Sequence, residues 1–519
     1  MLARPMTSDL AAAAREGGLR AVSLLGGQAV SYLIAGIGSI IIARLLGPEG
    51  YGLYSLALTV PTLVALFTDF GVSQALVRLT ARERGSPDLP GKVTSALLFA
   101  LFTALAAASA GVLAAPLLSE IVVRRSAVAF AAAVGMAYVA LNSVALASYS
   151  TLLGLGDARG LALAPVARET VKTLAAPALI LLGLGYLGAV VGHVAGYAAF
   201  AAFTVARVVK QLGVAKPAEP AQVRLLLSYG LPLYAGTVVS TLISTYQLSV
   251  LAWLVSDVEI GNFRAASNFA ALLSVLSAPI ASALFPMFSV IDGPETAAAF
   301  RYSVRYTALV LVPAGVFTAL AAPDLVRTVY GREYALAPLY LSLQALAYLY
   351  AGLGSAVLGS YFQGLGKPEV NFRAALVSSA VILVLTPPLA AAFRVAGAVA
   401  ATLAAALASL LYLLREAGKL GAKLDLNYSR RVYLASLLAG LAQAPLLLLE
   451  LHPLPRLALS AAVFLAAYLA CCVLVRCLTL EDVERLKSIL AVPLLKPLVD
   501  SAARLAARFI ASLERSGSG

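Results

Sequence analysis

Residues 53–78 read LYSLALTVPTLVALFTDFGVSQALVR. Residues 53–77 are long and apolar enough to cross a bilayer as one helix, because about 20 mostly apolar residues span its hydrocarbon core. This run nevertheless carries a carboxylate at Asp69, a glycine two residues later, and an arginine, Arg78, at its end. An ionisable side chain in a span is costly unless it is paired or faces a water-filled cavity. The stretch therefore predicts a membrane protein in which Asp69 has a partner or a function.

The composition of the whole chain agrees with this prediction. Of its 519 residues, 61% are hydrophobic and 12% are charged, and the mean hydropathy is +0.91. A soluble domain has about 25% charged residues, so lipid must solvate much of this surface. The net charge of +13 does not favour nucleic acid, because the basic residues lie between apolar segments. We expect no metal or other cofactor, and we interpret Cys471, Cys472 and Cys477 as packing residues.

Hydropathy divides the chain into fourteen predicted membrane spans. The N-terminus lacks the compact apolar core of a signal peptide, so we expect no cleavage. The tight turns at 183–187 and 393–395 separate neighbouring spans least clearly. The predicted spans are 21–46, 53–77, 93–118, 126–153, 161–183, 187–208, 225–255, 264–290, 303–322, 336–363, 371–393, 395–414, 432–451 and 457–478.

The distribution of basic residues predicts the orientation of these spans. With the N-terminus in the cytoplasm, the inner segments hold 21 Lys and Arg residues and the outer segments hold seven. Cytoplasmic loops of membrane proteins carry such an excess of positive charge. We therefore expect a multi-pass protein of the cell membrane with both termini in the cytoplasm.

An internal repeat appears when the sequence is shifted by 209 or 210 positions. The shift matches Gly52 to Gly261 and Tyr54 to Phe263, and it places LLGLGDARG (152–160) on YFQGLGKPE (361–369). Each copy contains six spans, so both copies have the same orientation, and two lobes with a site between them are expected.

The predicted fold is an all-α polytopic membrane protein with two pseudo-symmetric six-helix lobes and an appended helix pair. The segment after the last span has an apolar stripe among basic residues, which fits either an amphipathic helix on the cytoplasmic leaflet or a helix packed on the bundle. The predicted parts are a cytoplasmic N-terminus (1–20), an N-lobe (21–218), a C-lobe (219–420), the last two spans (421–478) and a cytoplasmic amphipathic tail (479–519).

Several stretches resemble one known family. GQAVSYLIAGIGSIIIARLLGPEGYGLYSLA (27–57) and FTDFGVSQALVRLTARE (67–83) resemble the first helices of polysaccharide biosynthesis, or Wzx-type oligosaccharide, flippases. YFQGLGKPEVNFRAALVSSAVILVLTPPLAAAFRVAGAVAAT (361–402) resembles helices 10 to 12 of the same proteins. The resemblance covers roughly residues 20–415, and LGPEGYGLY and GLGKPE are its most specific parts. These flippases share a superfamily with the MATE transporters and the lipid II flippase.

The resemblance implies a function. It implies two six-helix lobes that move a polyprenyl-linked oligosaccharide from the cytoplasmic to the outer leaflet. It also makes Arg264 a candidate for substrate binding, because an arginine early in this helix faces the cavity of lipid II flippases. Glycosyltransferases or a polymerase of the same pathway are the implied partners of a protein that we expect to be a monomer.

Charged residues inside the spans are the other candidates. Arg168 and Lys172 lie on one helix face at i, i+4, and Glu169 can pair with Lys172 at i, i+3. This cationic face suits a lipid-linked pyrophosphate, but a structural salt-bridge network that includes Asp69 explains it as well. Asp69 and Glu169 are thus either an ion-coupling site, for Na⁺ or H⁺, or a brace. The remaining candidates for substrate binding, which also fit ordinary positive-inside anchors, are Arg78 and Arg305.

Three functions remain in competition. A lipid-linked oligosaccharide flippase needs a site for an anion, and Arg168, Lys172 and Arg264 outnumber the two carboxylates by one. A MATE-like, cation-coupled exporter of drugs is the alternative, and it favours a negative cavity. A membrane enzyme acting on the same lipid needs a carboxylate cluster in a sizeable outer loop, and the sequence has none.

Overall fold

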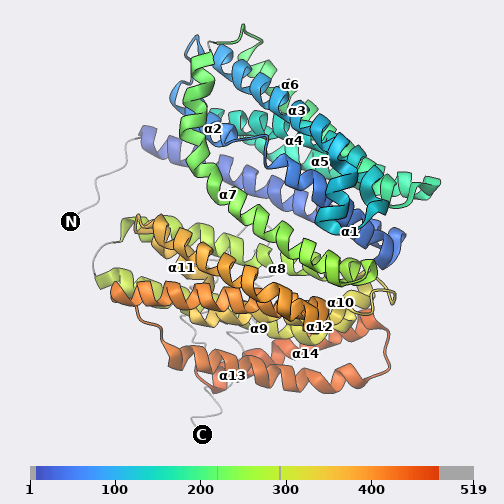
Figure 1. Ribbon diagram of the computed structural model, residues 1–519. Coiled ribbons are helices and arrows are strands. Elements are labelled where there is room, and N and C mark those ends of the chain that lie inside the picture. Colours follow the sequence, from blue (N-terminus) through green and yellow to red (C-terminus); the bar gives the residue numbers. More distant parts are fainter. Residues whose placement is uncertain (1–7, 219, 292–293, 478–519) are drawn as a thin grey trace. The chain divides into compact units, whose positions relative to one another are not determined.

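The computed structural model describes residues 8–218, 220–291 and 294–477, and side chains from residue 26 onward with some gaps. All regular elements of this described part are helical, and no strand occurs in it. The helices are shown in Figure 1. The predicted tail (479–519) and the first residues of the predicted N-terminus (1–7) lie outside the described residues.

The chain forms two compact units, Met1–Ala265 and Ala266–Gly519. The predicted division of the chain at 218–219 stays a prediction. The helices of the first unit are α1 (Ser8–Ala65), α2 (Val72–Arg82), α3 (Leu89–Val123), η1 (Ser126–Val128), α4 (Ala129–Leu155), α5 (Ala158–Leu179), η2 (Ile180–Leu184), α6 (Gly185–Leu212), α7 (Pro220–Leu254) and the start of α8 (Asp257–Val290). Those of the second are the rest of α8, α9 (Pro294–Val329), α10 (Ala337–Ala345), η3 (Leu346–Leu353), α11 (Ser355–Gly364), α12 (Pro368–Lys419), α13 (Leu426–Gln443), η4 (Ala444–Leu448) and α14 (Pro453–Leu474).

Some continuous stretches of helix extend over two predicted spans. Among the described residues, nine stretches of helix are long and apolar enough to cross a membrane, or ten if the bent pair Ala337–Leu353 and Ser355–Gly364 is one span. Three of the nine are interrupted by non-helical residues, Gly47 in α1, Gly183 before α6 and Arg394 in α12. These interruptions fall where the sequence predicts the divisions 46/53, 183/187 and 393/395. The count of fourteen spans stays a prediction that is compatible with them.

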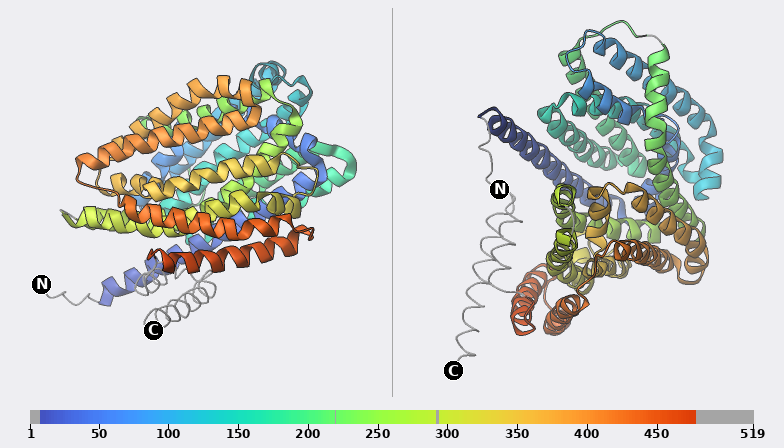
Figure 2. Two further views of the ribbon diagram at one scale, coloured as in Figure 1. Left: turned by 90° about the horizontal axis from the view of Figure 1, so that it is seen from below. Right: turned by 90° about the vertical axis from the view of Figure 1, so that its left-hand side faces the viewer.

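The last two described helices, α13 and α14, form an antiparallel pair that packs on α9 (Figures 1 and 2). Arg456 at the start of α14 forms a two-pronged ion pair with Asp324 near the end of α9, and both side chains are nearly buried. The Tyr468 hydroxyl donates to the carbonyl of Leu309 over 2.8 Å. A buried, doubly hydrogen-bonded ion pair is costly to separate, so the appended helices are fixed to α9.

The turn between α4 and α5 is organised around Asp157. Its carboxylate accepts from the N–H of Gly160 over 3.0 Å and from Nε and Nη2 of Arg207, on α6, over 2.7 Å each. Burial acts to raise the pKa of Asp157, but the hydrogen bonds from Arg207 and Gly160 outweigh it and leave this pKa below its usual value. The carboxylate therefore caps α5 and joins it to α6 in its ionised form.

We expect Asp157→Asn to lower the stability of the protein by about 1 kcal/mol near neutral pH, because the variant loses a charge-assisted cap. A pKa lowered by folding stabilises the protein above the pKa of the unfolded chain, and this stabilisation is lost as the pH falls through the folded value. The difference in unfolding temperature between wild type and variant should therefore be constant above about pH 5 and narrow as the pH falls below it. The exposed Asp88 supplies the control Asp88→Asn. A difference that stays constant with pH would contradict this account.

Candidate functional site

The predicted span 53–77 is interrupted in the structure. Helix α1 ends at Ala65 and α2 begins at Val72, and between them Phe70 and Gly71 adopt left-handed backbone angles, with φ of 46° and 82°. Asp69 lies in this break rather than inside a continuous helix. The prediction of one uninterrupted span is therefore wrong.

The Asp69 carboxylate satisfies backbone groups at the break. It accepts from the N–H of Gly71 over 3.2 Å, from the N–H of Ser73 over 3.1 Å, and from the Ser73 hydroxyl at a short distance. Asp69 itself is 5% exposed. An acidic side chain at the start of a helix replaces the missing partners of its first N–H groups and interacts favourably with the helix dipole. Asp69 thus begins the second half of a broken span.

The carbonyl groups at the break also find partners, in this case from other helices. The hydroxyl of Tyr234, on α7, donates to the carbonyl of Leu66 over 3.1 Å, and that of Thr103, on α3, donates to the carbonyl of Thr68 over 2.9 Å. A Cβ at Gly71 would lie 2.2 Å from the backbone of Gly230, on α7. Bonds from two other helices therefore satisfy carbonyls at the break, which lipid could not do for non-helical backbone.

The structure brings together Arg168, Glu169 and Lys172 on α5. Glu169 forms ion pairs with both cations, and its contact with Arg168 measures 2.8 Å. The side chain of Glu169 is 6% exposed, whereas those of Arg168 and Lys172 are 27% and 14% exposed. The ion pair of Glu169 with Lys172 is the one that the i, i+3 spacing predicts. Asp69 does not join the network, because the hydrogen bonds of its carboxylate are with Gly71 and Ser73 in the described part of the chain.

Aromatic rings of α4 and α6 surround this network, and no local pattern in the sequence predicts them. The guanidinium of Arg168 lies over the rings of Tyr197 and Phe200, at 5.2 and 5.4 Å from the ring centres. Tyr138 packs edge-to-face on Tyr197 with ring centres 4.6 Å apart, and His193 contacts both tyrosines. A cation held over aromatic faces keeps its charge at lower desolvation cost.

Glycines explain why α6 reaches the α5 network. A Cβ at Gly196 would lie 3.0 Å from Cβ of Lys172, and a Cβ at Gly192 would lie 2.4 Å from Cα of Ala176. Gly188, Gly192 and Gly196 recur every four residues and so share one face of α6. Such spacing of small residues lets membrane helices approach closely. This spacing is the signal in the sequence that predicts the contact between α5 and α6.

Arg264 lies in the third turn of α8. The phenol groups of Tyr51 and Tyr54, on α1, are its electrostatic neighbours. Its Nε atom is buried and has no hydrogen-bond partner, and no carboxylate forms an ion pair with it among the residues that the structure describes. The residue as a whole is half-buried, and a partly buried cation without an anion carries a desolvation cost. Arg264 is therefore a cation whose charge no carboxylate of the described chain compensates.

The last two predicted site residues lie on aromatic rings elsewhere. The guanidinium of Arg78 is 4.3 Å from the ring centre of Tyr229, and Arg78 is exposed. Arg305 belongs to the second unit, where its guanidinium lies 4.4 Å from the ring centre of Tyr428. Neither lies in the α5 network.

Comparison with known proteins places these features in a family. A model of the family described as polysaccharide biosynthesis protein matches residues 20–292, which is more than half of the chain. The chain belongs to this family. No match was found among curated protein sequences.

Solved structures show the fold. The lipid II flippase MurJ in an inward closed conformation has a TM-score of 0.74 at 14% identity, over 86% of this chain and 97% of MurJ. An inward-facing multidrug resistance MATE transporter of the MOP superfamily has a TM-score of 0.59 at 16% identity, over 77% and 99% of the two chains. A MOP superfamily transporter from Pyrococcus furiosus, whose title describes a binding pocket of reverse polarity, has a TM-score of 0.54 at 16% identity, over 78% and 95%. The predicted all-α, multi-pass membrane fold is thereby confirmed.

The network on α5 makes a prediction about stability. Glu169→Gln leaves two partly buried cations without their anion, and we expect a loss of about 3 kcal/mol in the free energy of unfolding. The matched control is Glu416→Gln, because Glu416 pairs with Lys419 at the same i, i+3 spacing on an exposed surface. Unfolding of the purified protein in detergent should show a large effect for the first variant and little for the second. If both variants lose the same free energy of unfolding, burial does not make the Glu169 ion pairs more important to stability than an exposed pair.

Proposed function

We propose that this member of the polysaccharide biosynthesis protein family is a flippase. It moves a polyprenyl-(pyro)phosphate-linked oligosaccharide from the cytoplasmic to the outer leaflet of the cell membrane by alternating access. The product serves the synthesis of cell-surface polysaccharide or of glycoprotein glycans. The family match and the MurJ-like fold support a membrane transporter or flippase rather than an enzyme.

One observation carries the choice of an anionic substrate. Arg264 is a cation with a buried Nε and no ion-pair partner in the described chain. A pyrophosphate brings negative charges and several acceptor oxygens, which a guanidinium binds through paired hydrogen bonds. The cost of the unpaired guanidinium in the empty protein is then offset only when such a substrate is bound.

The α5 network supports a second contact with the same substrate. Glu169 carries one negative charge against the two positive charges of Arg168 and Lys172, so the network retains a net charge of about +1. Arg168 is the most exposed of the three side chains. It can exchange part of its contact with Glu169 for a phosphate oxygen while it stays on its aromatic faces. Arg78 and Arg305 are proposed to act as membrane-surface anchors or as further phosphate contacts.

The alternative is a MATE-like exporter of cationic drugs that is coupled to Na⁺ or H⁺. The likeness to MATE transporters favours it, and so do Asp69 and Glu169, two of the buried carboxylates in the first unit. Both carboxylates are, however, engaged in the structure, Asp69 by the start of α2 and Glu169 by two cations. In the flippase hypothesis the same carboxylates provide ion coupling or act as braces.

The proposed cellular setting rests on the distribution of charge in the sequence. The excess of Lys and Arg in alternate connections supports cytoplasmic termini. The monomeric protein is proposed to receive its lipid-linked substrate from glycosyltransferases and to deliver it to a polymerase or transferase outside.

We expect Arg264→Gln to lower the initial rate of lipid-linked oligosaccharide translocation in proteoliposomes at least about tenfold, because one charge-assisted contact with phosphate is lost. The same variant should not lower the unfolding temperature of the substrate-free protein, since it removes a half-buried charge that has no anion in the described chain. Arg264→Lys should retain part of the rate, because it keeps the charge but loses the paired geometry.

The matched control is Arg332→Gln, which changes an exposed arginine in the turn after α9 and should leave the rate unchanged. If the wild-type protein expels cationic dyes and translocates no lipid-linked oligosaccharide, the exporter hypothesis replaces this proposal. If Arg264→Gln lowers the unfolding temperature together with the translocation rate, the arginine has a structural role instead.

A further inference from the structure

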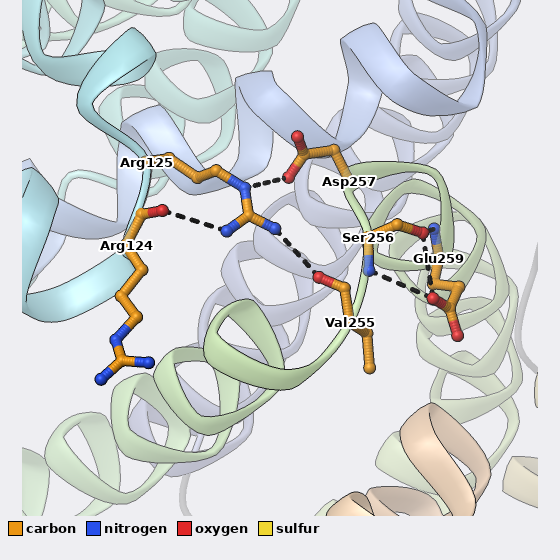
Figure 3. Close-up of polar contacts among 6 residues, drawn as sticks. All are labelled: Arg124, Arg125, Val255, Ser256, Asp257 and Glu259. Carbon is orange, nitrogen blue, oxygen red and sulfur yellow. Dashed lines mark hydrogen bonds and ion pairs between the residues drawn. The ribbon is translucent and has the colours of Figure 1, made fainter.

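The corner between α3 and η1 is hydrogen-bonded to the turn between α7 and α8, within the first unit (Figure 3). Arg125 donates from Nε to Oδ1 of Asp257 over 2.8 Å and from Nη2 to the carbonyl of Val255 over 2.9 Å. Its Nη1 donates to the carbonyl of Arg124 over 3.0 Å. One guanidinium therefore connects two turns that are 132 residues apart in the sequence.

The turn that Arg125 binds is itself well formed. The Glu259 carboxylate accepts from the N–H of Ser256 over 3.1 Å and from its hydroxyl over 2.9 Å, as in a capping box. These bonds are internal to the turn, so it can keep its shape when the contact with Arg125 is broken. Two further contacts cross the same interface and must open with the Arg125–Asp257 pair: the indole of Trp253, at the end of α7, donates to the carbonyl of Val122 over 3.2 Å, and the guanidinium of Arg124 lies 5.0 Å from its ring centre.

The first turns of α8 transmit the position of this turn to Arg264. A Cβ at Gly52, on α1, would lie 2.0 Å from the carbonyl oxygen of Asp257, and one at Gly261 would lie 1.8 Å from that of Pro48. Backbones in such contact leave no room for α8 to slide along α1, so α8 can leave α1 only by separating from it. Since Arg264 follows Asp257 by seven residues on one helix, a rigid movement of the turn displaces Arg264 as well.

We propose that the Arg125–Asp257 ion pair is a releasable latch. When it is closed, it holds the α7–α8 turn on the α3–η1 corner and positions Arg264 beside Tyr51 and Tyr54. When it opens, the turn and the first turns of α8 move away together. The role of the latch in transport rests on the proposed function. Its opening can be measured in the protein without any substrate.

The exposure of the pair distinguishes a latch from a permanent connection. The Arg125 and Asp257 side chains are 25% and 21% exposed, so water can replace their contact when it breaks. The Arg456–Asp324 pair, by contrast, is 12% and 1% exposed and would leave a buried charge unpaired. A partly exposed pair is also weakened by salt. Opening of the latch should therefore depend on ionic strength.

A cysteine inside the latch reports its opening without any substrate. The reporter is Val255→Cys, a change at a residue that is 4% exposed, in a chain with the native Cys471, Cys472 and Cys477 changed to serine. The rate of its reaction with a water-soluble maleimide is measured on purified protein in lipid nanodiscs. Arg125→Gln and Asp257→Asn should each raise this rate about tenfold, because each variant loses one charge-assisted hydrogen-bonded pair that keeps the latch closed. The exchanged pair Arg125→Asp with Asp257→Arg should restore a slow reaction.

Salt and a second ion pair provide the controls. Raising the salt concentration should accelerate the reaction in the reporter protein but not in its Asp257→Asn variant. Asp157→Asn, which breaks the ion pair with Arg207 in the same unit, should leave the rate unchanged. A reaction rate that Asp257→Asn does not change, or that Asp157→Asn raises equally, overturns the latch. Because no substrate is present, these outcomes do not depend on which molecule the protein transports.

Discussion

The structure depends on one constraint, which is that lipid offers no partner to a backbone N–H or C=O group. At 66–71 the chain leaves the helix, and every group released there must find a partner within the protein. The Asp69 carboxylate takes the N–H groups of Gly71 and Ser73, and hydroxyls from α3 and α7 take the carbonyls. The carboxylate that looked out of place in an apolar run is therefore what makes the break tolerable, and the break ties α1 and α2 to two other helices.

Hydropathy and short-range spacing predicted much of this molecule. They located the divisions at Gly47, Gly183 and Arg394, since a span has a fixed length, and the Glu169–Lys172 pair, since i and i+3 face each other in a helix. They did not reveal the interruption near Asp69, because Gly71 lies in a stretch as apolar as a continuous span. The rings around Arg168 and the partner of Arg125 come from other helices, and no local pattern specifies such contacts.

The charges within the two units are paired differently. In the second unit, the buried Asp324–Arg456 pair is closed on itself and fixes the appended helices. In the first unit, Glu169 is shared between two cations and Arg264 has no anion in the described chain. A pair that satisfies itself suits a scaffold, whereas an excess of positive charge suits the binding of an anion. The α5 network has no equivalent in the second copy of the repeat, where the positions that match Arg168, Glu169 and Lys172 are uncharged.

The contact between Gly52 and Gly261 restricts how α1 and α8 can move past each other. These residues are equivalent in the internal repeat, and they meet where α1 and α8 cross. A Cβ on Gly52 would lie 2.0 Å from the carbonyl oxygen of Asp257, and a Cβ on Gly261 would lie 1.8 Å from that of Pro48. Because neither glycine has a side chain, the two backbones touch directly, and any larger residue at either position must push the other helix away.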